Sequence, residues 1–125
     1  MGTIPTEFGF MSSLTQLYLD GNNIEGSIPS SLGTATQLSD LRLFDNRLRG
    51  TLPPSLGNLS LLRVLYIDTN FLSGTIPTEF GGMKSLQDFQ VRGGIVKSLL
   101  FAFVFSVLAM DMLCFFGENR VFDSK

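Results

Sequence analysis

Two carboxylates, Asp20 and Asp68, are the side chains whose type and position could support catalysis in this 125-residue sequence. Paired carboxylates act as acid and base, or as acid and nucleophile, when they flank a reacting bond. Other catalytic chemistry has few candidates, because the sequence contains no His and a single cysteine, Cys114. The commonest general base, the usual ligands of catalytic zinc and any internal disulfide are therefore missing from the sequence.

The composition argues against other classes of function. The net charge is −2, and the nine basic residues are scattered along the chain. A nucleic-acid-binding face requires clustered Lys and Arg, so we expect no nucleic acid partner. No Gly-rich phosphate loop with its lysine occurs, and we expect no cofactor. Hydrophobic residues make up 44% of the sequence, which is enough to build the core of one ordinary domain.

A 24-residue repeat organises most of the chain. The sequence GTIPTEFG occurs at residues 2–9 and again at residues 74–81. Two variants of it, GSIPSSLG and GTLPPSLG, begin between these copies, at Gly26 and Gly50. The segments LTQLYLDGNNIEG, LSDLRLFDNRLRG and LRVLYIDTNFLSG align without a gap. All three fit the pattern L-x-x-L-x-L-x-x-N-x-L-x-G. The two copies of GTIPTEFG therefore belong to different copies of one structural unit.

This unit closely resembles the plant-type leucine-rich repeat, whose G-x-I-P-x-x-L-G tail separates it from other classes of that family. The resemblance extends from Gly2 to about Val91. It implies an α/β horseshoe-type solenoid, with a short parallel β-sheet on the concave face and 3₁₀ or irregular segments on the convex side. It also implies an inward-facing ladder of asparagines, formed by Asn22, Asn46 and Asn70.

The residues support such a scaffold independently of the resemblance. In LYL, Leu17 and Leu19 fall on one side of a short strand and Tyr18 falls on the other. One such strand cannot bury its apolar side alone, so successive coils must stack and join their strands in parallel. We expect the asparagines to tolerate unusual backbone angles and to satisfy polar groups at the turns. We also expect tight bends at the glycines that open each unit and an extended backbone at the Ile-Pro and Leu-Pro pairs.

The outward strand positions stack in three columns across the four expected strands. The columns contain Tyr18, Arg42, Tyr66 and Gln90; Asp20, Phe44, Asp68 and Arg92; and Gln16, Asp40, Val64 and Asp88. The resemblance implies that such positions carry recognition. Tyr and Arg anchor interfaces, because they bury a large area and still form hydrogen bonds. We interpret these columns as a binding surface for a protein or peptide ligand; the alternative is ordinary strand residues, since Tyr and Phe also favour β structure.

The carboxylates Asp20 and Asp68 lie two strands apart on this surface. A strand spacing of about 4.8 Å separates them by roughly 10 Å, with Phe44 between them. Retaining glycosidases place their carboxylates about 5 Å apart, and inverting enzymes about 6.5–9.5 Å apart. We therefore interpret both as solvated surface aspartates and the protein as non-enzymatic.

The triplet NLS at Asn58 is the only N-glycosylation sequon. It leads into the third strand, away from the proposed binding surface. Asn58 is the predicted glycan site if the protein enters the secretory pathway. The first residues lack the charged start and the long apolar run of a signal peptide.

The repeat loses its pattern after Val91, and the composition changes to SLLFAFVFSVLAMDMLCFF, from Ser98 to Phe116. As a helix these 19 residues would span about 28 Å, close to the thickness of a bilayer core, with one charge at Asp111. The segment could cross a membrane, as in receptor-like proteins, and would then place the protein in a membrane or at the cell surface. It could instead cap the open end of the solenoid, or be non-native sequence from a shifted frame or an unspliced intron.

The sequence thus predicts a solenoid over residues 1–94, a hydrophobic helix over residues 95–117 and a polar tail over residues 118–125. The predicted function is protein or peptide recognition by a non-enzymatic module. This module could be anchored to a membrane. The alternatives are a soluble structural or inhibitor-like repeat protein and a truncated gene product without independent function. The chain opens in the middle of a unit, which favours a piece of a longer protein.

Overall fold

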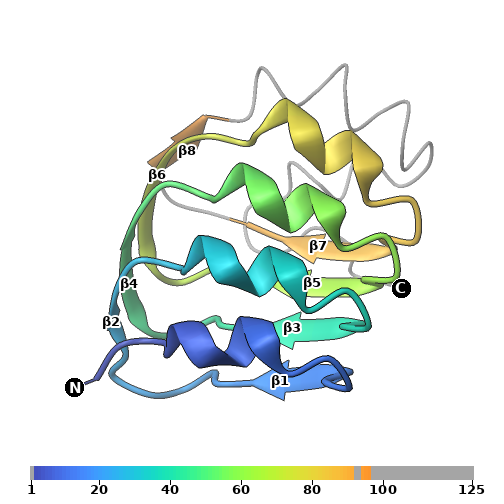
Figure 1. Ribbon diagram of the computed structural model, residues 1–125. Helices are drawn as coiled ribbons and strands as arrows, with labels where there is room; N and C mark the ends of the chain where they lie inside the picture. The colour runs from blue at the N-terminus through green and yellow to red at the C-terminus, as the bar shows by residue number, and fades with distance from the viewer. Residues whose placement is uncertain (1, 92–93, 97–125) are drawn as a thin grey trace.

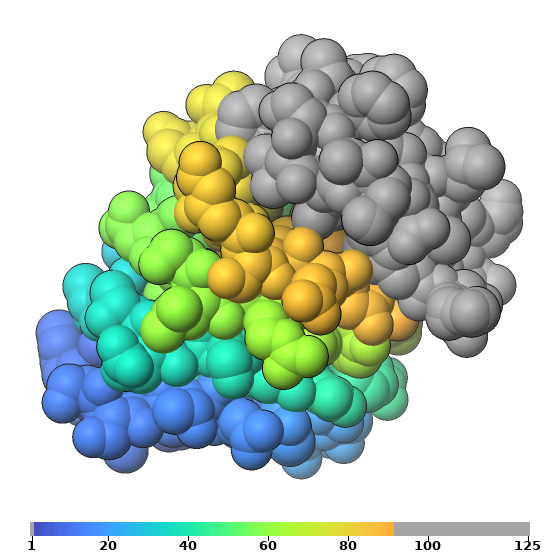
Figure 2. All heavy atoms as spheres, turned by 90° about the vertical axis from the view of Figure 1, so that its right-hand side faces the viewer, coloured from blue at the N-terminus to red at the C-terminus, as the bar shows by residue number. Residues whose placement is uncertain are grey.

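The computed structural model describes residues 2–91 and 94–96, which form a stack of four coils (Figure 1). Each coil contributes one 3₁₀ helix, one strand to a first sheet and one strand to a second sheet. Figure 2 shows the coils as bands of colour that follow one another in chain order. The predicted leucine-rich solenoid is thereby confirmed for the described residues. The 3₁₀ helices are η1 (Thr6–Phe10), η2 (Ser30–Thr34), η3 (Pro54–Asn58) and η4 (Thr78–Gly82).

The first sheet is parallel and follows the predicted strands. It consists of β1 (Gln16–Tyr18), β3 (Asp40–Arg42), β5 (Val64–Tyr66) and β7 (Asp88–Gln90), in that order. Paired residues lie one repeat apart, so Leu17 pairs with Leu41 and Leu41 pairs with Leu65. Leu41, Leu65 and Phe89 are completely buried. The inward side chains therefore form one core that continues from coil to coil.

A second parallel sheet runs along another side of the stack, and the sequence did not reveal it. Its strands are β2 (Glu25–Gly26), β4 (Arg47–Gly50), β6 (Phe71–Thr75) and β8 (Gly94–Val96). In β4 and β6 only Leu48 and Leu72 are buried, and the other residues, including the aromatic Phe71, are exposed or half-buried. A single buried residue in each strand leaves too little alternation for a strand to be predicted.

The 3₁₀ helices stack in a column of their own (Figure 1). Each follows a proline in extended backbone, such as Pro29 with φ −69° and ψ 138°, as the Ile-Pro and Leu-Pro pairs predicted. A Cβ atom at Gly33 would clash with the backbone carbonyl of Ser55, and one at Gly57 would clash with that of Glu79. Glycine is therefore required here because adjacent coils touch through their backbones.

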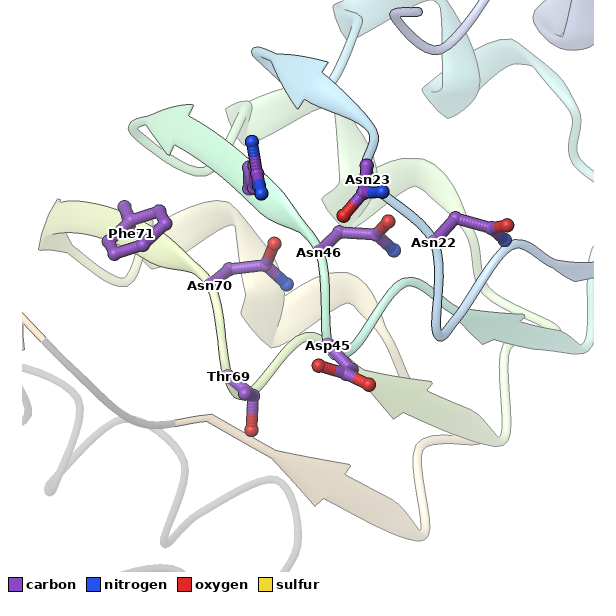
Figure 3. A pocket seen from close by; sticks show the side chains of 8 residues that line it. Asn22, Asn23, Asp45, Asn46, Thr69, Asn70 and Phe71 are labelled. Carbon is purple, nitrogen blue, oxygen red and sulfur yellow. The ribbon is translucent and has the colours of Figure 1, made fainter. Parts of the chain in front are cut away.

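The asparagine ladder is confirmed for Asn46 and Asn70, which bond to two coils, whereas Asn22 is exposed and bonds to its own coil. Asn46 Oδ1 accepts the N–H of Ile24 at 3.0 Å, and Nδ2 donates to the carbonyl oxygens of Leu19 at 2.9 Å and Leu43 at 3.1 Å. Asn70 repeats these contacts one coil later. Both amides point toward the preceding coil in Figure 3. The ladder thus satisfies turn groups that would otherwise lack partners in the interior.

The left-handed backbone at these turns falls on the residue before the asparagine, whereas the sequence suggested the asparagine itself. The φ angle is +69° at Gly21, +59° at Asp45 and +56° at Thr69. Glycine and aspartate adopt this region readily, but a β-branched threonine is strained there. The glycines that open the units also have positive φ, between +84° and +88°, which confirms the predicted bends at Gly26, Gly50 and Gly74.

The predictions for the C-terminal region lie almost entirely outside the described residues. These are the hydrophobic helix, the membrane segment from Ser98 to Phe116 and the polar tail. Ile95 and Val96, which the prediction placed in the hydrophobic helix, belong to strand β8 of the second sheet. The part of the chain that the structure describes contains no helix with the length and apolar character needed to cross a membrane.

Candidate functional site

The first sheet places the predicted binding residues in the expected columns. The register aligns Tyr18 with Arg42, Arg42 with Tyr66, and Tyr66 with Gln90. Arg92 lies outside the described residues. We call the remaining predicted residues the first-sheet strip: Gln16, Tyr18, Asp20, Asp40, Arg42, Phe44, Val64, Tyr66, Asp68, Asp88 and Gln90.

Arg42 lies at the centre of the first-sheet strip, where three neighbours hold it. Its Nε donates to Asp40 Oδ1 and its Nη2 donates to Asp40 Oδ2, both at 3.0 Å. Its Cζ lies 4.7 Å from the ring centroid of Tyr18 and 5.3 Å from that of Tyr66. The bidentate pair fixes the plane of the guanidinium, and the rings stabilise it from their faces. The side chain is still 36% exposed, so a partner can reach it.

Asp40 has a different role from the one its column suggested. Its residue exposure is only 8%, and its Oδ2 also accepts the hydroxyl of Tyr18 at 2.8 Å. A buried carboxylate needs such partners to offset its lost hydration. Because Tyr18 and Arg42 already engage both oxygens, Asp40 positions these two side chains and has little capacity left for a ligand.

A second tyrosine–aspartate pair occurs two coils later. The hydroxyl of Tyr66 donates to Asp88 Oδ2 at 2.6 Å. The ring of Phe44 packs edge-to-face on the ring of Tyr66, with centroids 6.0 Å apart and an interplanar angle of 64°. Such aromatic contacts restrict ring motion. The strip therefore presents an ordered aromatic surface around Arg42.

These contacts raise three pKa values. Burial, followed by the hydrogen bond to Asp88, raises the pKa of Tyr66 to about 12. The hydrogen bond to Asp40 raises the pKa of Tyr18 and also that of Arg42. Both phenols therefore keep their protons, and Arg42 its charge, throughout the neutral range.

The tyrosine–aspartate pairs have a sequence signal that reading by columns overlooks. Tyr18 and Asp40 are 22 residues apart, as are Tyr66 and Asp88. This spacing is one full repeat less two strand positions, which makes the partners diagonal neighbours on one face of the sheet. A search for complementary residues at that spacing would have found both pairs.

Asp20 and Asp68 retain acceptor capacity. Within the described residues, the carboxylate of Asp20 forms no hydrogen bond or ion pair, and Asp68 Oδ2 accepts one hydrogen bond, from the hydroxyl of Thr69 at 3.1 Å. No group of three His, Cys, Asp or Glu residues in the described ranges could hold a metal ion. What the first-sheet strip offers chemically is charge, hydrogen bonds and aromatic surface.

A groove of about 320 Å³ lies at the turns that follow the first sheet (Figure 3). The ladder residues Asn46 and Asn70 line it, but their amides are committed to the backbone. Phe71 is 57% exposed, and the guanidinium of Arg49 lies 5.0 Å from its ring centroid. This groove could not be predicted from the sequence, because its residues belong to the scaffold part of the repeat. Its lining consists of Asn22, Asn23, Asp45, Asn46, Arg47, Thr69, Asn70 and Phe71.

Asn58, the predicted glycan site, is the last residue of η3 and is exposed. It belongs to the column of 3₁₀ helices and not to the first-sheet strip. Its position leaves room for a glycan, while glycosylation itself stays a prediction.

Comparison with known families decides the relationship of this chain. The family model for the Leucine Rich Repeat matches residues 13–35, 37–59 and 61–83, which together make up more than half of the sequence. The chain belongs to the leucine-rich repeat family. No curated protein matches this leucine-rich repeat chain.

Solved structures show that its repeats are of the plant receptor type. The leucine-rich repeat chain is 41% identical to the plant peptide hormone receptor RGFR1 in complex with RGF2, with a TM-score of 0.74 over 75% of this chain and 15% of that one. It is 30% identical to the ectodomain of the receptor kinase GASSHO1/SCHENGEN3 from Arabidopsis thaliana, with a TM-score of 0.73 over 75% and 11% of the two chains. It is 38% identical to the ectodomain of the Arabidopsis receptor kinase HAESA, with a TM-score of 0.66 over 74% of this chain and 16% of that one. The leucine-rich repeat chain thus spans only a small part of the length of each receptor.

Proposed function

We propose that this leucine-rich repeat chain is a non-enzymatic recognition module that binds a protein or peptide through the first-sheet strip. The observation that carries the proposal is Arg42, which Asp40 and two tyrosine rings hold in one orientation while 36% of its side chain stays exposed. Side chains that are ordered before binding lose little entropy when a ligand arrives. Arg and Tyr are also the residue types that contribute most to interface energetics.

The related structures support a peptide as the partner. RGFR1 is in complex with RGF2, and HAESA is in complex with an IDA peptide hormone. Four strands at a spacing of about 4.8 Å make a sheet some 15–20 Å wide. A sheet of this width offers less area than a standard protein–protein interface, which buries about 800 Å² per partner. The strip therefore suits a short peptide segment.

A phage-displayed random peptide library, selected on the full chain, tests this proposal. We expect the wild-type chain to enrich binding peptides. Arg42→Ala and Tyr66→Ala should each weaken one enriched synthetic peptide by on the order of 10- to 100-fold, because each removes a central anchor. Fluorescence anisotropy measures the affinity, and circular dichroism checks the fold.

Phe10→Ala is the matched control, since Phe10 is an aromatic side chain that is 71% exposed outside the first-sheet strip. This variant should bind the peptide as the wild-type chain does. Recognition through the strip is contradicted if no peptide is enriched, or if Phe10→Ala weakens binding as much as Arg42→Ala does.

We also propose, from the apolar composition of Ser98 to Phe116 alone, that the module is attached to a membrane at the cell surface. After alkaline carbonate extraction of expressing cells, the chain should stay in the membrane pellet. Release into the supernatant would contradict the anchor and would leave the recognition proposal untouched.

A further inference from the structure

The first-sheet strip has an excess of negative charge. It contains four carboxylates, Asp20, Asp40, Asp68 and Asp88, and one described cation, Arg42. The pair between Arg42 and Asp40 is bidentate at 3.0 Å, so these two charges compensate each other. Asp88 accepts the hydroxyl of Tyr66. The carboxylates with the most remaining acceptor capacity are therefore Asp20 and Asp68, two residues beyond the carboxyl-terminal ends of β1 and β5; the Oδ1 of Asp68, which bonds to no group among the described residues, is buried.

Phe44 stands between Asp20 and Asp68 in the same column. A spacing of about 4.8 Å between strands puts each aspartate next to the phenylalanine position. Phe44 is only partly buried, and its ring is braced by Tyr66. The face of an aromatic ring attracts a cation, and a carboxylate beside the ring can pair with the same cation. Asp20, Phe44 and Asp68 together therefore complement a positively charged group.

Other described cations near this column do not neutralise it. Arg63 is exposed at the opposite, amino-terminal end of β5. Arg47 lies beyond the turn in β4, where it pairs in register with Glu25 of β2. Neither arginine forms an ion pair with Asp20 or Asp68 among the described residues. Asp45, exposed directly after Phe44, adds a further negative charge at this edge.

We propose that the ligand of the first-sheet strip is a basic peptide that seats an Arg or Lys side chain on Phe44, between the carboxylates of Asp20 and Asp68. This inference rests on the proposed recognition function and adds the chemical class of its ligand. The complementary charges accelerate association and reject acidic peptides. Since the site is partly open to solvent, salt weakens the binding.

The test uses the peptides enriched from the random library by the wild-type chain. We expect these peptides to carry more Lys and Arg than the unselected library. One enriched basic peptide should bind the double variant Asp20→Asn/Asp68→Asn on the order of 10- to 100-fold more weakly, because two charge-assisted contacts are lost. Phe44→Leu keeps apolar area but removes the ring, and should weaken binding by about fivefold.

Glu79→Gln is the matched control, because it removes an exposed carboxylate from η4, outside the first-sheet strip. This variant should bind as the wild-type chain does. Enriched peptides without a basic bias, or a double variant that binds as tightly as Glu79→Gln, overturn the cation site while recognition stands. If no peptide is enriched, the recognition function fails, and the inference that rests on it fails with it.

Discussion

The column of 3₁₀ helices and the first-sheet strip use the same repeat in opposite ways. On the 3₁₀ side, successive coils repeat the same residues, such as Gly33 and Gly57, because adjacent backbones touch there. On the strip, the central column changes from Tyr18 to Arg42 and back to Tyr66. Close packing permits one residue type at a position, whereas an outward strand position tolerates many. Residue types that repeat from coil to coil in this chain therefore indicate positions of close packing. Residue types that vary from coil to coil indicate the surface that can acquire specificity for a ligand.

Substituting a glycine on the 3₁₀ side should have the largest effect on stability. Gly57→Ala places a Cβ against the backbone carbonyl of Glu79, where the neighbour cannot rotate away. We expect the free energy of unfolding to fall by about 3 kcal/mol, as measured by urea denaturation. Gly2→Ala is the control, because a Cβ there meets no atom within 4 Å. Equal stability of the two variants would show that the coils do not touch as described.

The asparagine ladder links successive coils at the turns after the first sheet, and its members should differ in importance. Asn46→Leu leaves the Ile24 N–H without its partner and removes one of two asparagine donors from each of the Leu19 and Leu43 carbonyl oxygens, so we expect a loss of about 2 kcal/mol. Asn22 is exposed and, among the described residues, donates only to carbonyl oxygens of its own coil, at Leu19 and Asp20. Asn22→Leu should therefore cost less than about 1 kcal/mol. Urea denaturation of both variants gives the comparison, and the reverse order would refute a ladder that links coils.

Ionisation of Tyr66 should affect stability only at alkaline pH. A phenol with a pKa of about 12 in the folded chain binds its proton more tightly than one with the ordinary value of 10. Its contribution to stability is therefore complete below pH 10 and is lost as the pH rises from 10 through 12. The chain has only two tyrosines, so Tyr18→Phe leaves Tyr66 as the sole phenol for ultraviolet titration.

In that variant we expect phenolate absorbance to rise well above pH 10. The additional change Asp88→Asn should lower the midpoint, because it removes the second cause of the raised pKa. A midpoint near 10 in a chain that circular dichroism shows to be folded would contradict the partly buried Tyr66–Asp88 pair.

The sequence by itself determined the coil and its stacking. A 24-residue repeat with inward leucines requires the coils to stack, since each strand must bury its apolar side against the next coil. The inward positions Leu41 and Leu65 and the outward column of Arg42 follow from that repeat, because side chains alternate along a strand. The ladder at Asn46 was implied by the resemblance to the plant-type leucine-rich repeat.

Only the tertiary structure decided how the outward residues pair and which of them remain available. Asp40 and Asp20 both occupy outward columns, yet Asp40 is buried under Tyr18 and Arg42 while Asp20 has no such partner among the described residues. The second sheet and the left-handed backbone at Thr69 were likewise set by contacts between coils. The physical reason is that a repeat specifies which face of a strand each side chain occupies. The diagonal hydrogen bonds and the burial on that face depend on the size and charge of neighbours one coil away.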